Sequence, residues 1–141
     1  MAKDFEYLEH TADLQFIAYG NSLGECFKNA AIAMFSAIVD PNSVENKISR
    51  EVAIKAPDLQ TLLHNWLAEL LFLFETDLVV FSDFDVQVEW DNEYYLKAVA
   101  KGDNIYPKKH VIKADIKAVT YHEMRVEKKG GVWTAKVLCD I

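Results

Sequence analysis

The spacing of apolar residues changes near Leu78. Before this point, two long segments repeat apolar residues at the spacing of one helical face. After it, apolar and polar residues alternate, as they do in strands with one buried face. Strands that follow one another along a chain tend to form hairpins, so the sequence predicts an α+β fold in which helices cover an antiparallel or mixed sheet.

The first helix is predicted to begin after Asn21. Ser22-Leu23-Gly24-Glu25 fits a capping box, in which the serine accepts a hydrogen bond from a backbone N–H and the glutamate side chain reaches back. Asp40-Pro41-Asn42 predicts the end of the helix, because proline cannot continue it. Its apolar face consists of Leu23, Phe27, Ala30, Ala31, Met34, Phe35 and Ile38.

Pro57-Asp58 opens a second predicted helix, with Asp58 as its N-cap. Phe72 and Leu73 widen its apolar surface beyond one stripe. We therefore expect this helix to be central and covered on more than one side. Its apolar residues at helical spacing are Leu59, Leu62, Leu63, Trp66, Leu67, Leu70, Leu71 and Phe74.

Strands are predicted before, between and after these helices. After the second helix come two hairpins, the first turning at Asp91-Asn92 and the second at Gly130-Gly131, where a tight turn needs positive φ. The predicted strands are residues 5–9, 14–19, 51–55, 84–90, 94–100, 116–127 and 132–139. We therefore expect one domain over residues 1–141, with two long helices packed on one face of an antiparallel or mixed sheet built largely of hairpins.

The charge of the chain limits its partners. The net charge is −7 and the pI is about 5.0, whereas a protein that grips nucleic acid by itself usually presents a basic face to the phosphates. The dense basic groups are Lys108-Lys109-His110, in a predicted loop from Gly102 to Asp115, and Lys128-Lys129. We expect no stable independent binding of nucleic acid, while transient contact through one basic loop stays open.

Several features predict a cytoplasmic protein without membrane contact. The first six residues lack the apolar core of a signal peptide. The most apolar segment, residues 66–74, is about half the length that a bilayer needs and contains Glu69. Cys26 and Cys139 form neither a disulfide framework nor a metal-binding pair, and both are predicted to be buried free thiols in a reducing compartment.

Two polar segments are candidate sites. Glu9-His10-Thr11-Ala12-Asp13 interrupts an extended segment, and its side chains either line a site at a sheet edge or hydrogen-bond the backbone of a turn. In Asp140-Ile141, a side-chain carboxylate and the terminal carboxylate are one residue apart. Such oxygen donors suit Ca²⁺ or Mg²⁺; the alternative is a frayed, hydrated terminus.

The remaining polar and aromatic groups point less clearly to a function. The chain has no GxGxxG, Walker lysine loop, HExxH or nucleophile elbow. The absence of these motifs does not exclude an enzyme, but it favours a non-catalytic protein. The Lys108-Lys109-His110 cluster could contact a phosphate or an acidic partner, or it could be a solvated loop. Trp66, Trp90 and Trp133 are assigned to packing.

Together these segments resemble the archease family along nearly the whole chain. The segments that carry the resemblance are Tyr7-Leu8-Glu9-His10-Thr11-Ala12-Asp13, Ala18-Tyr19-Gly20-Asn21-Ser22-Leu23 with Phe27 and Asn29-Ala30-Ala31, Leu62-Leu63 with Trp66-Leu67 and Glu69-Leu70-Leu71, Lys117-Ala118-Val119-Thr120-Tyr121-His122, and Trp133-Thr134-Ala135-Lys136-Val137-Leu138 with Asp140-Ile141. Their order and spacing make the match specific.

The resemblance implies a function and a site. Archeases are partners of the tRNA-splicing ligase that joins RNA ends bearing a 2′,3′-cyclic phosphate or 3′-phosphate to a 5′-hydroxyl. The family role implies a non-catalytic activator that promotes ligase guanylylation and multiple turnover and broadens nucleotide use. It also implies a divalent cation, Ca²⁺ before Mg²⁺ or Mn²⁺, on Asp13, Asp140 and the carboxylate of Ile141, with His10 and Lys109 as candidate partner contacts.

Two other classes of function stay open. The same carboxylates could serve a small metal-dependent hydrolase with His10 as its base. The chain could instead be a general chaperone or interaction module whose acidic surface keeps it in solution. Turnover without the ligase would favour the hydrolase, and equal help to unrelated proteins would favour the chaperone.

Overall fold

The computed structural model describes residues 3–9 and 12–141. Two helices, one short 3₁₀ helix and seven strands make up this part of the chain. In chain order they are β1 (Phe5–Leu8), β2 (Asp13–Gly20), α1 (Leu23–Ile38), η1 (Pro41–Ser43), β3 (Ile48–Ala56), α2 (Leu59–Asp77), β4 (Val79–Trp90), β5 (Tyr94–Asn104), β6 (Ala118–Lys129) and β7 (Val132–Asp140).

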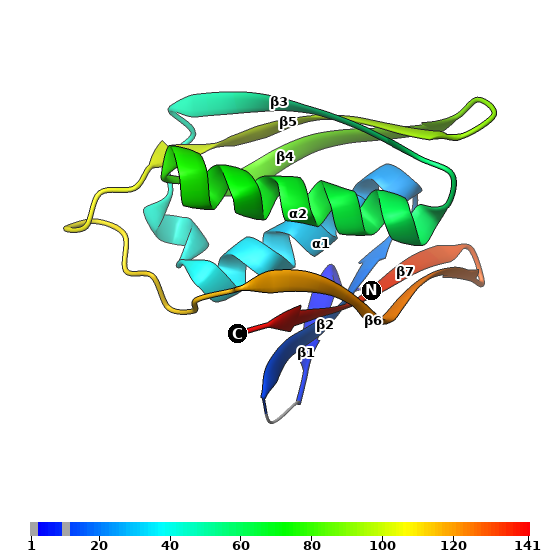
Figure 1. Ribbon diagram of the computed structural model, residues 1–141, viewed down its shortest axis with the longest axis horizontal. Helices are drawn as coiled ribbons and strands as arrows, with labels where there is room; N and C mark the ends of the chain where they lie inside the picture. The colour runs from blue at the N-terminus through cyan, green and yellow to red at the C-terminus, as the bar shows by residue number, and fades with distance from the viewer. Residues whose placement is uncertain (1–2, 10–11) are drawn as a thin grey trace.

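The strands form two antiparallel sheets with the helices between them (Figure 1). One sheet has the order β1-β2-β7-β6 and the other has the order β3-β5-β4. The predicted α+β class and both hairpins are confirmed, but the strands divide into two sheets where one was expected. The two helices form one layer that buries apolar residues on more than one side. A sheet on each side of this layer covers those residues.

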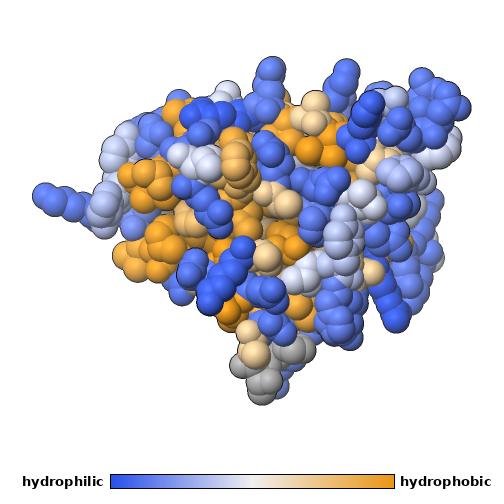
Figure 2. Space-filling view, viewed as in Figure 1, coloured by the Kyte–Doolittle hydropathy of each residue, from blue (hydrophilic) through white to orange (hydrophobic). Residues whose placement is uncertain are grey.

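We call β3-β5-β4 the upper sheet and β1-β2-β7-β6 the lower sheet, as they lie in Figure 1. The loop of residues 105–117 carries the chain from the upper sheet to the lower one. It leaves β5, runs past the C-terminal ends of both helices and enters β6 (Figure 1, yellow). On the face drawn in Figure 2, hydrophilic residues cover much of the surface, while hydrophobic residues gather over the half nearer this loop. Neither helix of the described chain combines the length and apolar content needed to cross a bilayer.

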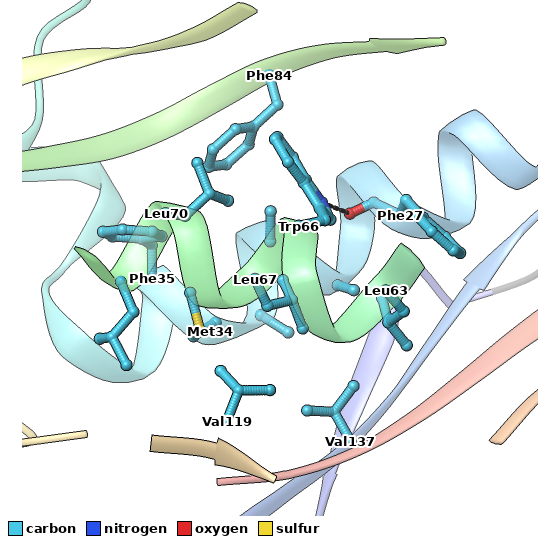
Figure 3. Packing of buried hydrophobic residues seen from close by; sticks show 14 of the residues in the cluster. Phe27, Met34, Phe35, Leu63, Trp66, Leu67, Leu70, Phe84, Val119 and Val137 are labelled. Carbon is cyan, nitrogen blue, oxygen red and sulfur yellow. Dashed lines mark hydrogen bonds between the residues drawn. The ribbon is translucent and has the colours of Figure 1, made fainter. Parts of the chain in front are cut away.

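The core lies where the two helices meet both sheets (Figure 3). Trp66 of α2 is fully buried, and its Nε1 donates a hydrogen bond to the backbone oxygen of Phe27 in α1 at 3.0 Å. Its ring meets Phe84 of β4 edge-to-face, with 5.9 Å between ring centroids. On the opposite side, Val119 and Val137 of the lower sheet complete the apolar cluster.

Local sequence signals set the ends of the helices. The Ser22 hydroxyl accepts from the Glu25 N–H at 3.1 Å, and the Glu25 side chain accepts from the N–H of Asn21, one residue before the expected partner. Asp58 caps α2 by accepting from the Thr61 N–H at 2.8 Å. These predictions are confirmed because capping depends on residues close together in the chain.

Gly102 of β5 is expected to be intolerant of a side chain. A Cβ at this position would overlap the carbonyl oxygen of Val80 in β4, at the irregular part of the β4–β5 pairing. Gly102→Ala should therefore lower the free energy of unfolding by about 1–3 kcal/mol, measured by urea denaturation. Gly130→Asn is the control, because no atom lies within 4 Å of a Cβ there and asparagine tolerates positive φ. Equal effects of the two changes would contradict this account.

Candidate functional site

Asp13 and Asp140 lie directly opposite one another in the lower sheet. Asp13 is the first residue of β2, Asp140 is the last residue of β7, and the antiparallel register pairs them. Side chains of directly opposed residues project from the same face, with Cβ atoms about 4.5–5.5 Å apart. The structure thus brings two predicted site residues together from the two ends of the sequence.

The acidic pair lies at an accessible end of the sheet. Asp13 is half-buried and Asp140 is exposed. On its other side Asp140 faces Ala118 of β6, and the Asp140 backbone oxygen accepts a hydrogen bond from the Lys117 N–H at 2.8 Å. These backbone bonds fix the Asp140 main chain between β2 and β6.

Cys139 precedes this aspartate but points to the opposite face of the sheet, where it is fully buried. Burial and the negative charge of Asp140 raise the pKa of the Cys139 thiol to about 12. The thiol therefore stays protonated near neutral pH and offers no thiolate to a metal. The prediction of buried free thiols is confirmed for both cysteines.

The chemistry of the donor set fits a hard cation. The two opposed side chains offer carboxylate oxygens from neighbouring strands, the kind of donor that Ca²⁺ and Mg²⁺ prefer. Ile141 follows Asp140 and is half-exposed, with 49% of its surface accessible. Within residues 3–9 and 12–141, no three side chains of His, Cys, Asp or Glu gather into a metal site. A cation here would thus need further oxygen ligands, such as the Ile141 carboxylate or water.

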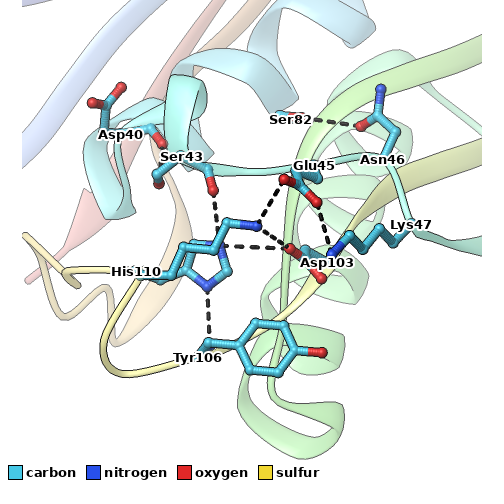
Figure 4. A network of polar contacts seen from close by, with 10 residues as sticks. Asp40, Ser43, Glu45, Asn46, Lys47, Ser82, Asp103, Tyr106 and His110 are labelled. Carbon is cyan, nitrogen blue, oxygen red and sulfur yellow. Dashed lines mark hydrogen bonds and ion pairs between the residues drawn. The ribbon is translucent and has the colours of Figure 1, made fainter.

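Lys109 belongs to an ion-pair cluster with Asp103 and Glu45, both labelled in Figure 4. Its Nζ is 3.1 Å from Oδ2 of Asp103 and 3.4 Å from Oε1 of Glu45. The Asp103 side chain is 1% exposed, while that of Lys109 is 33% exposed. We call Glu45, Asp103, Lys109 and His110 the Asp103 cluster.

His110 connects the loop to the 3₁₀ helix η1. Its Nδ1 accepts a hydrogen bond from the Tyr106 N–H at 3.0 Å. Its Nε2 lies 3.0 Å from the backbone oxygen of Ser43, so the ring proton belongs on Nε2 and is donated to that oxygen. His110 is only 3% exposed. Of the predicted basic cluster, Lys108 is exposed, Lys109 is partly buried and His110 is buried.

Asp103 is a charged group that the lysine keeps ionised inside the protein. Burial raises the pKa of Asp103, but the hydrogen bond from Lys109, the charges of Lys109 and Lys47 and the Asn104 backbone outweigh it, so the pKa lies below its ordinary value. Oδ1 of Asp103 is buried and has no hydrogen-bond partner among the described residues. Lys109 therefore neutralises a carboxylate that is almost fully shielded from water.

Neither the role of Asp103 nor the burial of His110 was predicted from the sequence. Asp103 follows Gly102 at the predicted start of a loop, and nothing in the alternating pattern marks it as buried. The one available signal was a carboxylate six residues before a lysine in the same loop. His10, also a predicted site residue, lies outside the described residues.

The fold and the acidic pair together define a class of small α+β proteins, in which two helices lie between antiparallel sheets and the C-terminal strand ends beside the start of β2. Residues 5–141 match the Archease protein family (MTH1598/TM1083). The chain belongs to the archease family.

Individual relatives support the same assignment over almost the full length. The chain is 50% identical to "Protein archease" of Methanosarcina acetivorans, covering 99% of this chain and 97% of the relative. It is 45% identical to "Protein archease" of Pyrococcus abyssi, covering 99% of each.

Two solved structures share the fold. The solution structure of Methanobacterium thermoautotrophicum protein 1598 superposes with a TM-score of 0.88 at 39% identity, covering 98% of this chain and 99% of the other. A crystal structure from Thermotoga maritima, described as an archease and possible chaperone, has a TM-score of 0.62 at 20% identity, covering 100% of this chain and 98% of the other. The second likeness shows the fold alone.

Proposed function

We propose that this protein is a non-catalytic activator of the tRNA-splicing RNA ligase. Its ligase would join RNA ends bearing a 2′,3′-cyclic phosphate or 3′-phosphate to a 5′-hydroxyl. The activator promotes guanylylation of the ligase, sustains multiple turnover and broadens nucleotide use. Membership of the archease family supports this role, and the observation that carries it is the direct pairing of Asp13 with Asp140.

Asp13 and Asp140 hold a divalent cation in this proposal, with the Ile141 carboxylate as a third oxygen ligand. Calcium accepts six to eight oxygen ligands in flexible geometry, so it tolerates a site built on two strand ends more readily than magnesium does. When bound, the cation supplies positive charge that phosphate oxygens of the ligase's nucleotide can meet. The two aspartates position that charge, and the sheet register fixes their separation.

The charge of the chain supports an activator rather than an independent RNA binder. With a net charge of −7, the protein as a whole repels a phosphate backbone. Its contribution to an RNA reaction is therefore best made through a protein partner that binds the RNA itself.

Removal of one carboxylate of the pair should abolish activation without unfolding the protein. We expect Asp13→Asn and Asp140→Asn each to reduce single-turnover ligase guanylylation by at least about tenfold, since each loss of about 1.4 kcal/mol in the assembled site is a factor of ten. Calcium should raise the melting temperature of the wild type, because a ligand at about 100 times its Kd adds roughly 2.7 kcal/mol of stability. It should not do so for either variant.

The matched control is Asp91→Asn, which removes a carboxylate from the exposed β4–β5 turn. This variant should activate the ligase and respond to calcium as the wild type does. Full activation by both site variants would remove the cation from the mechanism. Turnover of RNA ends without the ligase would instead support the hydrolase, and equal help to unrelated proteins would support a chaperone.

A further inference from the structure

Loop 105–117 differs in charge from the rest of the chain. It contains four lysines and one aspartate, whereas the chain as a whole has a net charge of −7. The loop also exposes apolar side chains: Val111 is 73% exposed, Tyr106 46% and Ile112 41%. A long loop of this composition, without secondary structure of its own, is more often functional than a simple connection.

Backbone hydrogen bonds hold this loop at its beginning, middle and end. The Ile105 N–H donates to the oxygen of Leu78 at 2.9 Å, the Lys113 N–H to that of Ile38 at 2.7 Å, and the Lys117 N–H to that of Asp140 at 2.8 Å. The loop is thus attached to the C-terminal ends of both helices and to β7. Because these bonds restrict its backbone, little conformational entropy would be lost when it binds a partner.

The Asp103 cluster adds a side-chain attachment to these backbone bonds. Lys109 joins the loop to buried Asp103 of β5, and His110 joins it to Ser43 of η1. Both side chains therefore turn toward the protein. Their neighbours Lys108 and Val111 are exposed, and so are Ile112 and Lys113.

We propose that loop 105–117 is a docking segment for a partner protein with an acidic rim around an apolar recess. Val111 and Ile112 enter the recess, and Lys108 and Lys113 pair with the acidic rim. Lys109 is a positioning residue, which holds the loop through Asp103. The inference rests on the proposed function, because the partner it names is the ligase.

A protein surface fits this loop better than RNA does. Val111 and Ile112 are aliphatic, and they offer neither a planar ring for stacking on a base nor a charge for a phosphate. The exposed ring of the loop, that of Tyr106, is already stacked on His110, with 6.0 Å between ring centroids. Buried aliphatic contacts ringed by charged pairs are the usual anatomy of a protein interface. The end of the loop is also bonded to Asp140, so a partner on the loop would lie beside the acidic pair.

The test measures the affinity of the full chain for the purified ligase at low and high salt. Val111→Ser with Ile112→Ser, and separately Lys108→Glu with Lys113→Glu, should each weaken binding at least about tenfold. The charge-reversed variant should also show a flatter salt dependence, since it has lost the attractive pairs that salt screens. All four side chains are exposed, so the melting temperatures should match the wild type.

The control is Lys128→Glu with Lys129→Glu, the same charge reversal at the exposed end of β6. It should bind the ligase as the wild type does. Wild-type affinity of both loop variants, or equal weakening by the control, would overturn the docking segment while leaving the proposed function intact. The docking segment would also be overturned if the full chain bound single-stranded RNA more tightly than the ligase and the loop substitutions weakened that RNA binding. A wild type that neither binds nor activates the ligase would overturn the proposed function and this inference with it.

Discussion

Replacing Lys109 with methionine is expected to lower the free energy of unfolding by about 3 kcal/mol, the lower end of the range for removing one partner of a buried ion pair. Methionine keeps most of the side-chain volume but leaves Asp103 charged and 1% exposed. Lys47 and the Asn104 backbone still face the carboxylate, which limits the loss. Urea denaturation at neutral pH measures the difference.

The difference between Lys109→Met and the wild type should shrink in acid. Asp103 of the wild type has a folded-state pKa below its ordinary value of about 3.9. Its charge therefore contributes stability above about pH 4, and this contribution is lost as the pH falls toward the folded-state pKa. In the variant, the lysine that lowers the pKa is gone and the penalty for burying a charge appears as the pH rises. Urea denaturation of the wild type and of Lys109→Met at pH 7 and at pH 3 measures how far the difference in the free energy of unfolding shrinks.

Lys47→Met is a matched control for this prediction. Lys47 also pairs with Glu45, at 2.8 Å, but its side chain is 59% exposed. Exposed ion pairs contribute little to stability, so this variant should lose much less than Lys109→Met. If both variants lost the same small amount at every pH, the Asp103 cluster would have no special role in holding the loop.

The features that could be predicted from the sequence are local ones. The caps at Ser22 and Asp58 and the positive φ of Gly130 and Gly131 are confirmed, because each depends on residues a few positions apart. The position of α2 between the two sheets is confirmed by the burial of Leu62, Trp66 and Leu70. Phe72, which was expected to widen its buried surface, is instead 55% exposed.

The division into two sheets could not be predicted in this way. An alternating pattern gives the two faces of a strand but does not name its partner. The pairing of β2 with β7 joins residues more than a hundred positions apart, and β3 pairs with β5 across α2 and β4. The juxtaposition of Asp13 and Asp140 was therefore available only from the family resemblance.

The ion pair of Lys109 was hidden for a similar reason. The sequence shows a run of basic residues that favours an exposed loop, but Asp103 and Glu45 come from β5 and from the segment before β3. Only the packing of these segments reveals that Lys109 is bound within the protein and Lys108 is not. The prediction that Lys109 contacts a partner stays a prediction.

Trp66→Ala is expected to be the most destabilising single change described, with a loss of about 3–5 kcal/mol. Trp66 is fully buried between the helices and the upper sheet, so its removal leaves a cavity next to Phe84. It also removes the hydrogen bond to Phe27 that joins α2 to α1. Thermal and urea unfolding should both show the loss.

Trp90→Ala is the matched control, and the exposure of Trp90 shows that its predicted role in core packing was wrong. It was assigned to packing with Trp66, but it lies at the end of β4 and is 61% exposed, in contact with Tyr94 at 4.7 Å between ring centroids. The assignment was wrong because the alternation of β4 continues beyond the point where the helices cover the sheet. Trp90→Ala should therefore cost about 1 kcal/mol or less, the energy of one aromatic pair at the surface. Equal losses in the free energy of unfolding for the two variants would mean that the end of the β4–β5 hairpin is covered in solution. They would also contradict the dominant contribution of the core around Trp66 to stability.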